Sequence, residues 1–279
     1  MIGLATSREL PELSGGEQLL YGALCERGEC AIVVWDDPQE SWRACETIII
    51  RCTWDYSGRV IEFLKWIDRV EAAGIRLENA PDILRWNSDK LYLRDLAARG
   101  VTIPPTVWIG REKLTRELLQ RHVTGPCVIK PTVSAGAYNT LRVSPETIDE
   151  VLAQLGGLNE HKGLMLQPFI PEVQEPGEYS LIFVRNEFSH AVLKTPAPGD
   201  FRVQPRYGGV QAATTVGADV IAQARAALAA IPFQAVPLYG RVDGIVRGGQ
   251  FVLMELELIE PYLFWEFGEG SVTRFAKVV

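Results

Sequence analysis

The stretch "LYGRVDGIVRGGQFVLMELELIEP", Leu238–Pro261, decides the fold, because it reads as two strands joined by a turn at Gly248-Gly249. In the second strand the residue types alternate, so Glu255 and Glu257 share one face and leucines occupy the other. The turn brings Asp243 of the first strand opposite these glutamates. Carboxylates so close repel one another and are costly to bury unpaired, so we expect a cation between them.

Two interpretations of this hairpin compete. One is a solvated face of an antiparallel sheet, on which charged residues alternate harmlessly. Against it, this face carries three carboxylates and the two strands contain no lysine to balance them. Carboxylate oxygens suit Mg²⁺, which prefers one or two carboxylates together with substrate phosphates. The sequence therefore predicts a magnesium site at Asp243, Glu255 and Glu257.

Composition narrows the class of protein. The chain has 279 residues, of which 47% are hydrophobic and 23% charged, as in ordinary globular proteins. The net charge of −7 and the lack of a basic stripe argue against nucleic-acid binding. The longest apolar runs are too short to cross a bilayer, and no N-terminal signal peptide is visible. We expect a cytoplasmic protein that binds no membrane.

The cysteines are odd in number and lack the spacing of zinc sites. Together with a cytoplasmic location, this predicts that all of them are reduced, mostly buried thiols. They are Cys25, Cys30, Cys45, Cys52 and Cys127.

The pattern of elements predicts an α/β protein whose second half is α+β. Up to about residue 80, short apolar strands alternate with helical stretches, as in a small parallel α/β domain. From Glu178 onward the chain reads as antiparallel strand pairs around one alanine-rich helix. We expect three domains, at residues 1–82, 83–170 and 171–279.

Motifs for common nucleotide sites, zinc proteases and serine hydrolases are absent, and there are only three histidines. Lysines, arginines and carboxylates are therefore the candidates for chemistry. Lys130 lies in the apolar strand "CVIKPT", where it either reaches solvent at a sheet edge or meets an anion. Lys90 stands at the start of a helix predicted to be capped by Asn87 or Ser88, and taken alone it reads as a surface residue. The small residues from Ser134 to Ala137 follow Lys130, and their backbone amides are suited to cradling a phosphate.

Further candidates have two interpretations each. Glu178 is either a turn residue or an acceptor for sugar hydroxyls. Arg202 and Arg206, in a polar loop, are either surface residues or a clamp for a phosphoryl group. The stretch "RCTWDY", Arg51–Tyr56, closes a strand of the parallel sheet, where ligands gather in α/β proteins. Its aromatic residues suit either packing or substrate binding.

Taken in order, these residues resemble the ATP-grasp ligases, and most closely their bacterial glutathione synthetase-like group. The resemblance lies in a lysine at a helix start, the strand "VIKP", a small-residue loop, the strand "LQPFI", an acid, and then an aspartate and "ELE". With "RCTWDY" and "GDFRVQPRYGG", the chain is similar to the amino-acid ligase branch that includes the O-ureido-serine cyclo-ligase of cycloserine biosynthesis. Two departures stand out: "SAGAYN" is poor in glycine, and Glu257 replaces the usual asparagine.

The resemblance implies an ATP-grasp fold, in which two subdomains clasp ATP behind an N-terminal α/β domain. It implies ATP and Mg²⁺ as cofactors and assigns a role to each candidate residue. Nucleotide binding falls to Lys90, Lys130, Ser134, Gly136, Gln167, Phe169, Ile170 and Glu178, and metal binding to Asp243, Glu255 and Glu257. Arg202 and Arg241 are the catalytic candidates, and Arg51, Thr53, Trp54, Asp55 and Tyr56 the substrate-binding ones.

The hypothesis is a carboxylate ligase that forms an acyl phosphate on a small amino-acid-like substrate and then an amide-type bond. Phosphoryl transfer needs positioning and charge neutralisation more than a protein nucleophile, so the lack of a catalytic histidine is no objection. Two alternatives stay open: a small-molecule kinase, and a nucleotide-binding regulatory module with degenerate chemistry. The sequence leaves open whether the ligation is intramolecular and whether the protein is a homo-oligomer.

Overall fold

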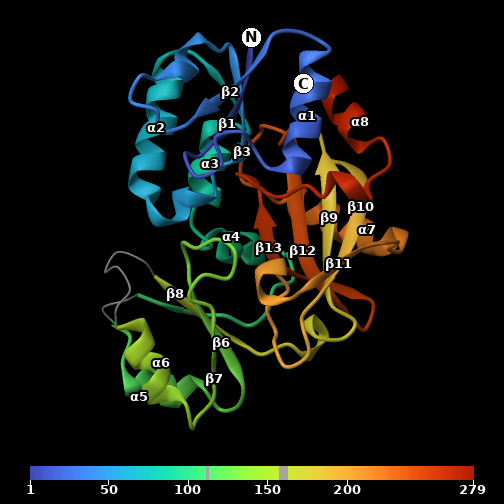
Figure 1. Cartoon of the computed structure of the whole chain (residues 1–279). Coiled ribbons are helices and arrows are strands. Elements are labelled where there is room, and N and C mark those ends of the chain that lie inside the picture. Colours follow the sequence, from blue (N-terminus) through green and yellow to red (C-terminus); the bar gives the residue numbers. More distant parts are fainter. Residues whose placement is uncertain (111–112, 157–162) are drawn as a thin grey trace.

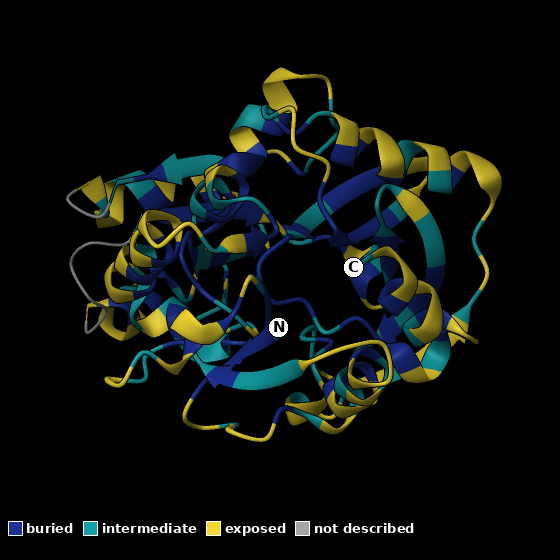
Figure 2. Ribbon diagram, turned by 90° about the horizontal axis from the view of Figure 1, so that it is seen from above, coloured by how far each residue is buried: buried dark blue, intermediate teal, exposed yellow. Residues whose placement is uncertain are grey.

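A computed structural model describes residues 1–110, 113–156 and 163–279. Three sheets follow one another along the chain, and each is covered by its own helices (Figure 1). The strands are mostly buried, whereas the outward faces of the helices are exposed (Figure 2). A parallel sheet followed by antiparallel sheets confirms the predicted mixed α/β class. The domain boundaries at residues 82 and 170 stay a prediction.

The first sheet is parallel, in the strand order β2-β1-β3-β4. Its strands are β1 (Ile2–Thr6), β2 (Cys30–Val34), β3 (Thr47–Cys52) and β4 (Arg76–Glu78), and its helices are α1 (Gly15–Cys25) and α2 (Val60–Ala72). The apolar face of α2 supplies Phe63, Trp66, Ile67 and Val70 to the core. Strand–helix alternation with short connections thus produces the parallel sheet expected from the sequence.

The second sheet is antiparallel, in the order β5-β8-β6-β7. It consists of β5 (Val107–Ile109), β6 (Cys127–Pro131), β7 (Leu141–Val143) and β8 (Leu164–Pro168). Two short helices, α5 (Arg116–His122) and α6 (Ile148–Leu155), pack against each other and share an apolar core with the strands.

The third sheet is also antiparallel, in the order β11-β10-β9-β12-β13. It consists of β9 (Glu178–Val184), β10 (Glu187–Thr195), β11 (Val210–Thr214), β12 (Tyr239–Arg247) and β13 (Gln250–Glu257). One apolar cluster joins these strands to three helices, α3 (Pro81–Asn87), α4 (Tyr92–Ala98) and α7 (Ala218–Ala229). The hairpin of β12 and β13 turns at Gly248 and Gly249, as the sequence predicted.

The last helix, α8 (Ser271–Val278), returns to the beginning of the chain and packs against α1 (Figure 1). Phe264, Trp265 and Phe275 join Leu4 and Leu20 in one buried cluster. The N-terminal sheet is therefore held to the third sheet through the C-terminal segment, which fixes the space between them.

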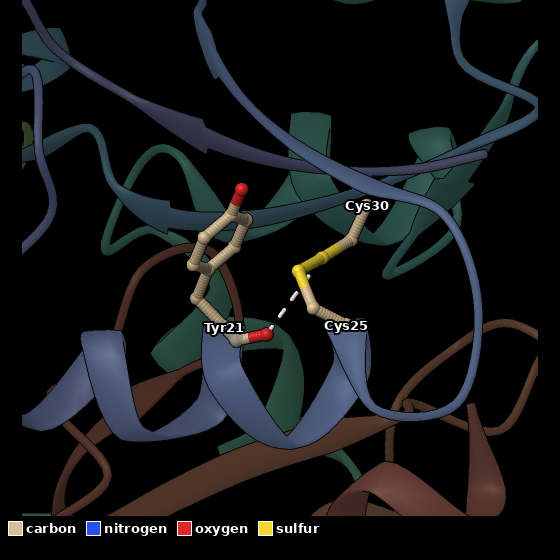
Figure 3. The surroundings of a disulfide bond; sticks show 3 residues. All are labelled: Tyr21, Cys25 and Cys30. Carbon is tan, nitrogen blue, oxygen red and sulfur yellow. Dashed lines mark hydrogen bonds between the residues drawn. A yellow bond between two sulfur atoms is a disulfide. The ribbon is translucent and has the colours of Figure 1, made fainter.

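Two sequence predictions about local structure are wrong. Asn87 and Ser88 do not cap a helix, because Asn87 is the last residue of α3 and the next helix begins at Tyr92. Cys25 and Cys30 form a disulfide, with 5.3 Å between their Cα atoms, instead of two thiols (Figure 3). It joins the end of α1 to the start of β2, and the Tyr21 carbonyl oxygen lies 3.7 Å from Cys30 Sγ.

The other three cysteines, Cys45, Cys52 and Cys127, are free and buried, as expected. Within the described ranges, no helix is long and apolar enough to cross a membrane. The cytoplasmic location stays a prediction.

Candidate active site

A cavity of about 1170 Å³ lies where the three sheets meet. It is lined by the loop after β3, by the turn before α4, by β6 with its following loop, and by the hairpin of β12 and β13. Its size is sufficient for a nucleotide and a second small molecule. Of the residues predicted from the sequence, those that line it are Trp54, Asp55, Tyr56, Lys90, Lys130, Ser134, Gly136, Gln167, Phe169, Ile170, Glu178, Arg202, Arg206, Arg241, Asp243, Glu255 and Glu257.

The three predicted metal carboxylates share one face of the hairpin. Asp243 pairs directly with Glu255, and Arg241 pairs with Glu257, across β12 and β13. Asp243 is 2% exposed, whereas the side chains of Glu255 and Glu257 retain 30% and 26% of their exposure. The two glutamates are therefore open to a ligand and the aspartate is enclosed.

The two strands contain no lysine to balance this face, as the sequence showed, but Arg241 of β12 itself and Lys194 of β10 supply the balancing charge. Lys194 Nζ, on β10, lies 2.9 Å from Asp243 Oδ2 and 2.5 Å from Glu178 Oε1. Arg241 donates to both Asp243 oxygens and to Glu257 Oε1. Ser180 adds a 2.6 Å hydrogen bond to Asp243. Asp243 is thus compensated by the protein itself.

Lys90 compensates Glu255. Its ammonium lies 3.1 Å from Glu255 Oε1 and donates to the Ser134 carbonyl oxygen at 2.5 Å. The residue is only 6% exposed, so it is no surface lysine. Asn87 holds the turn that carries it, because the Asn87 amide donates to Leu256 O and accepts from Leu258 N, at 2.8 Å each.

The charges around the hairpin shift the pKa values of its three carboxyls in different directions. Burial alone would raise the pKa of Asp243 and of Glu255, but their cationic partners hold both below their usual values. For Glu257, burial and the neighbouring carboxylates outweigh Arg241, and the pKa rises to about 7. A cation bound in the cavity would therefore lower the pKa of Glu257 and favour its charged form.

Lys130 reaches the same cavity from β6. Its ammonium group forms no hydrogen bond or ion pair with a described residue. Burial and the Lys90 charge lower its pKa, although the Glu255 charge opposes them. The loop after it carries positive φ angles at Gly136, Ala137 and Asn139. Arg206 donates to the Gly136 carbonyl oxygen, which ties this loop to the third sheet. An uncompensated lysine beside a tight loop is suited to an anionic ligand.

The residues predicted to surround the adenine lie at the end of β8. Gln167 donates to Thr106 Oγ1 at 3.0 Å, and Ile170 is buried. Phe169 contacts Phe201 edge to face, with 6.2 Å between ring centroids. Together they form an apolar wall with a fixed polar edge.

The arginine expected at the phosphoryl group is tied back in this structure. Arg202 forms an ion pair with Asp200 at 2.7 Å, and its guanidinium lies 3.7 Å from the centre of the Tyr207 ring. The carboxylate raises the pKa of Arg202, so the side chain stays charged while it lines the cavity.

The stretch from Arg51 to Tyr56 is only partly a cavity wall. Trp54, Asp55 and Tyr56 line the cavity, but Arg51 and Thr53 do not. Arg51 is 1% exposed and binds Glu17 through two hydrogen bonds of 2.7 and 2.8 Å. Its predicted contact with substrate is therefore wrong, because the guanidinium is fully used inside the protein. Thr53 is likewise fully enclosed.

No group of three histidine, cysteine or carboxylate side chains in the described part of the chain forms a ready metal cage. The reason is visible in the hairpin, where Arg241 lies between Asp243 and Glu257. The arrangement instead offers two partly exposed glutamates facing a cavity that also holds an uncompensated lysine.

Comparison with known proteins shows the family of the chain. Residues 89–230, about half of the chain, match the model of the prokaryotic glutathione synthetase ATP-grasp domain. The cycloserine biosynthesis protein DcsG of Streptomyces lavendulae is 34% identical over 260 residues, which cover 88% of this chain and 86% of that protein. The chain belongs to the ATP-grasp ligases.

Other comparisons place this ATP-grasp ligase within the family. Residues 2–79 match the N-terminal domain model of D-cycloserine synthetase DcsG. The crystal structure of that synthetase superposes with a TM-score of 0.86 at 27% identity, covering 99% of this chain and 97% of the other. Glutathione synthetase of Rhodopseudomonas palustris is 28% identical over 62% of this chain and 53% of its own.

D-Alanine–D-alanine ligase of Bacillus anthracis shares the fold of this ATP-grasp ligase, with a TM-score of 0.70 at 14% identity, over 99% of this chain and 96% of that one. The resemblance stated from the sequence is thus confirmed for fold and family. Sequence reasoning missed Lys194, the buried cation on which both Glu178 and Asp243 depend. Its one signal was a lysine in an otherwise apolar strand, "HAVLKT".

Proposed function

We propose that this ligase uses ATP and Mg²⁺ to activate the carboxylate of a small amino-acid-like substrate and to join it to a nitrogen nucleophile. The observation that carries the proposal is the convergence on one cavity of Lys130 with its tight loop and of the partly exposed Glu255 and Glu257. Lys130 and its loop suit the phosphates of ATP, and the two glutamates suit the metal ion that accompanies the phosphates.

Two of the three carboxylates on the hairpin are better placed than the third to bind magnesium directly. Glu255 and Glu257 present accessible oxygens on one face, whereas Asp243 is saturated by Lys194, Arg241 and Ser180. We therefore propose Glu255 and Glu257 as the direct ligands, with Asp243 holding Arg241 in place. When bound, Mg²⁺ would neutralise phosphate charge and orient the transferred group.

The remaining nucleotide contacts follow from position. Lys90 and Lys130 would bind phosphate oxygens, and the loop from Ser134 to Gly136 would cover them. Gln167, Phe169 and Ile170 would line the adenine pocket. Glu178 would accept hydrogen bonds from the ribose while keeping its ion pair with Lys194.

The reaction has two displacements. A substrate carboxylate oxygen forms a bond to the γ-phosphorus as the bond to the β–γ bridging oxygen breaks, which gives ADP and an acyl phosphate. A nitrogen nucleophile then forms a bond to the acyl carbon, and inorganic phosphate leaves with the electron pair of the broken C–O bond. The proton that the nitrogen loses passes to the released phosphate or to solvent. Arg202 and Arg241 would stabilise the charge that develops on these oxygens. Trp54, Asp55 and Tyr56 would form the substrate side of the cavity.

The test is ADP release from Mg-ATP across a panel of free amino acids and small amino-acid derivatives. O-ureido-serine belongs in the panel, because the similar protein of Streptomyces lavendulae acts in cycloserine biosynthesis. Release that depends on one carboxylate-bearing compound supports the ligase and identifies the acid. Formation of a stable phosphorylated product without a nucleophile would indicate a kinase instead, and no release with any compound would contradict the proposal.

A further inference from the structure

The segment that follows β13 is held by an unusual set of contacts. Four consecutive backbone carbonyl oxygens, from Ile259 to Tyr262, each lie within hydrogen-bond distance of a side-chain donor. The donors are Tyr239 Oη at 2.8 Å from Ile259 O, Trp54 Nε1 at 3.0 Å from Glu260 O, Arg51 at 2.6 Å from Pro261 O and Arg241 at 3.0 Å from Tyr262 O. Two donors come from the first sheet region and two from β12, so the segment is fixed from both sides.

The side chain of Glu260, in this segment, lacks such partners. Glu260 is 8% exposed and lines the cavity, yet among the described residues no other residue forms a hydrogen bond or ion pair with its carboxyl. Burial raises the pKa of Glu260 well above its usual value, and the Glu257 charge adds to this. The Lys90 charge and the backbone N–H of Glu260 itself stabilise the carboxylate only in part. The protein therefore immobilises the backbone of a buried carboxyl and gives the carboxyl no ion-pair partner, which is costly unless a ligand completes it.

Each neighbouring carboxylate has a cationic partner, which Glu260 lacks. Asp243 has Arg241 and Lys194, Glu255 has Lys90, and Glu257 has Arg241. Glu260 lies beyond the end of β13, beside Trp54 of the substrate side. Lys90, the cation whose charge acts on Glu260, is itself paired with Glu255. A ligand can therefore supply the missing ion-pair partner, on the side of the cavity where Trp54 and Tyr56 form the wall.

We propose that Glu260 binds the positively charged amino group of the amino-acid substrate and so selects amino acids over other carboxylic acids. This inference rests on the proposed function. An ammonium group has three donors and a compact charge, so it satisfies a buried carboxylate that has no other partner. Glu260 is thereby a specificity-determining residue, separate from the carboxylates assigned to the metal.

A first test needs no knowledge of the substrate. If Glu260 serves a ligand, Glu260→Gln removes an uncompensated group, so the thermal unfolding midpoint of the free protein should stay the same or rise. The matched control is Glu17→Gln, which breaks the buried ion pair with Arg51 and should lower the midpoint by about 5 °C or more. A loss in Glu260→Gln like that in Glu17→Gln would make Glu260 a structural residue and overturn the inference.

The second test compares substrates with and without the amino group. ADP release is measured with O-ureido-serine, and with the pairs serine and glycerate, and alanine and lactate. Each second member of a pair replaces the amine by a hydroxyl. The wild-type protein should require the amine. Glu260→Gln should raise the KM for the active amino acid at least about tenfold while the KM for ATP changes less than about twofold.

Glu266→Gln is the control for this second test, because Glu266 is an exposed carboxylate at the cavity rim that hydrogen-bonds Tyr262 at 3.1 Å. It should leave both KM values unchanged. An unchanged KM for the amino acid in Glu260→Gln, or equal turnover of its deaminated counterpart by the wild type, contradicts the inference and leaves the ligase intact. Absence of ADP release with every compound contradicts the proposed function, and the inference with it.

Discussion

Asp243 lies opposite Glu255 because the pairing of β12 with β13 shifts by one residue between Asp243 and Gly244. From the turn up to Gly244 the two strands pair in the register that a two-residue loop sets, with Arg247 opposite Gln250. The bulge then moves Asp243 from the position facing Met254 to the one facing Glu255. The acidic face of the site depends on this single irregularity.

Gly244→Ala tests the bulge. A Cβ at this position would lie 2.5 Å from the Val252 carbonyl oxygen and 2.5 Å from the Phe251 ring. Because backbone cannot move aside cheaply, we expect a loss of about 2 kcal/mol in the free energy of unfolding and a matching loss of ligase activity. Urea unfolding measures the first. The control is Gly22→Ala, in the middle of α1 with open space around it, which should be neutral or stabilising. Equal stability of the two variants would contradict this account of the bulge.

Glu255→Gln tests the metal assignment. The change keeps the shape of the side chain but removes the charge proposed to bind Mg²⁺, so ADP release should fall by about 10²-fold or more. Circular dichroism should show an unchanged fold, since the side chain is partly exposed. Activity near that of the wild type would refute the assignment.

Lys194→Met tests the buried charge network. Lys194 is enclosed between Glu178 and Asp243, and its removal leaves two carboxylates short of a cation. Breaking such a pair from one side should cost about 3 kcal/mol of unfolding free energy, measured in urea. Lys277→Met, on the exposed side of α8, provides the comparison and should change the free energy of unfolding by less than about 0.5 kcal/mol. A loss for Lys194→Met no larger than that control would contradict the proposed role of the network.

His190 makes stability depend on pH. Its Nε2 lies 3.0 Å from the carbonyl oxygens of Leu263 and Phe264, Ser189 Oγ lies 2.9 Å from Nδ1, and burial lowers its pKa. Below the ordinary value of 6.5 the unfolded chain binds a proton that the folded protein does not, so stability falls as pH decreases.

Between pH 6.5 and 5.5 the free energy of unfolding should therefore decrease, by at most about 1 kcal/mol, the limit for a folded state that binds no proton; urea unfolding at each pH measures it. His190→Gln keeps a donor for the carbonyl oxygens but does not titrate, so its stability should depend less on pH over this interval. An identical dependence in both proteins would show that His190 stays protonated or exposed in the folded state.

The sequence predicted most of the strands, the cavity-lining lysines and the acidic hairpin, because periodicity and turn residues are local signals. It could not predict the partners of these residues. A two-residue turn at Arg185-Asn186 pairs Glu178 with Leu193, but a bulge between Phe188 and His190 pairs it with Lys194. The network around Asp243 therefore depends on an irregularity without a clear sequence signal.

Arg51 illustrates a second limit. A strand-end arginine near aromatic residues is typical of a ligand site, and its true partner, Glu17, lies on a helix 34 residues earlier in the chain. Only the packing of α1 on the sheet brings the two together. The Cys25–Cys30 disulfide likewise depends on how α1 ends against β2, which spacing alone did not show.

The central claim, that a substrate carboxylate is phosphorylated and then joined to nitrogen, is tested most directly with isotope-labelled carboxylate. The substrate found in the ADP-release panel is prepared with ¹⁸O in its carboxyl group and converted with Mg-ATP. An acyl phosphate transfers one carboxyl oxygen to the phosphate that leaves, so mass spectrometry should find ¹⁸O in inorganic phosphate, in step with product. Unlabelled phosphate, with both labelled oxygens kept in the product, would contradict the account.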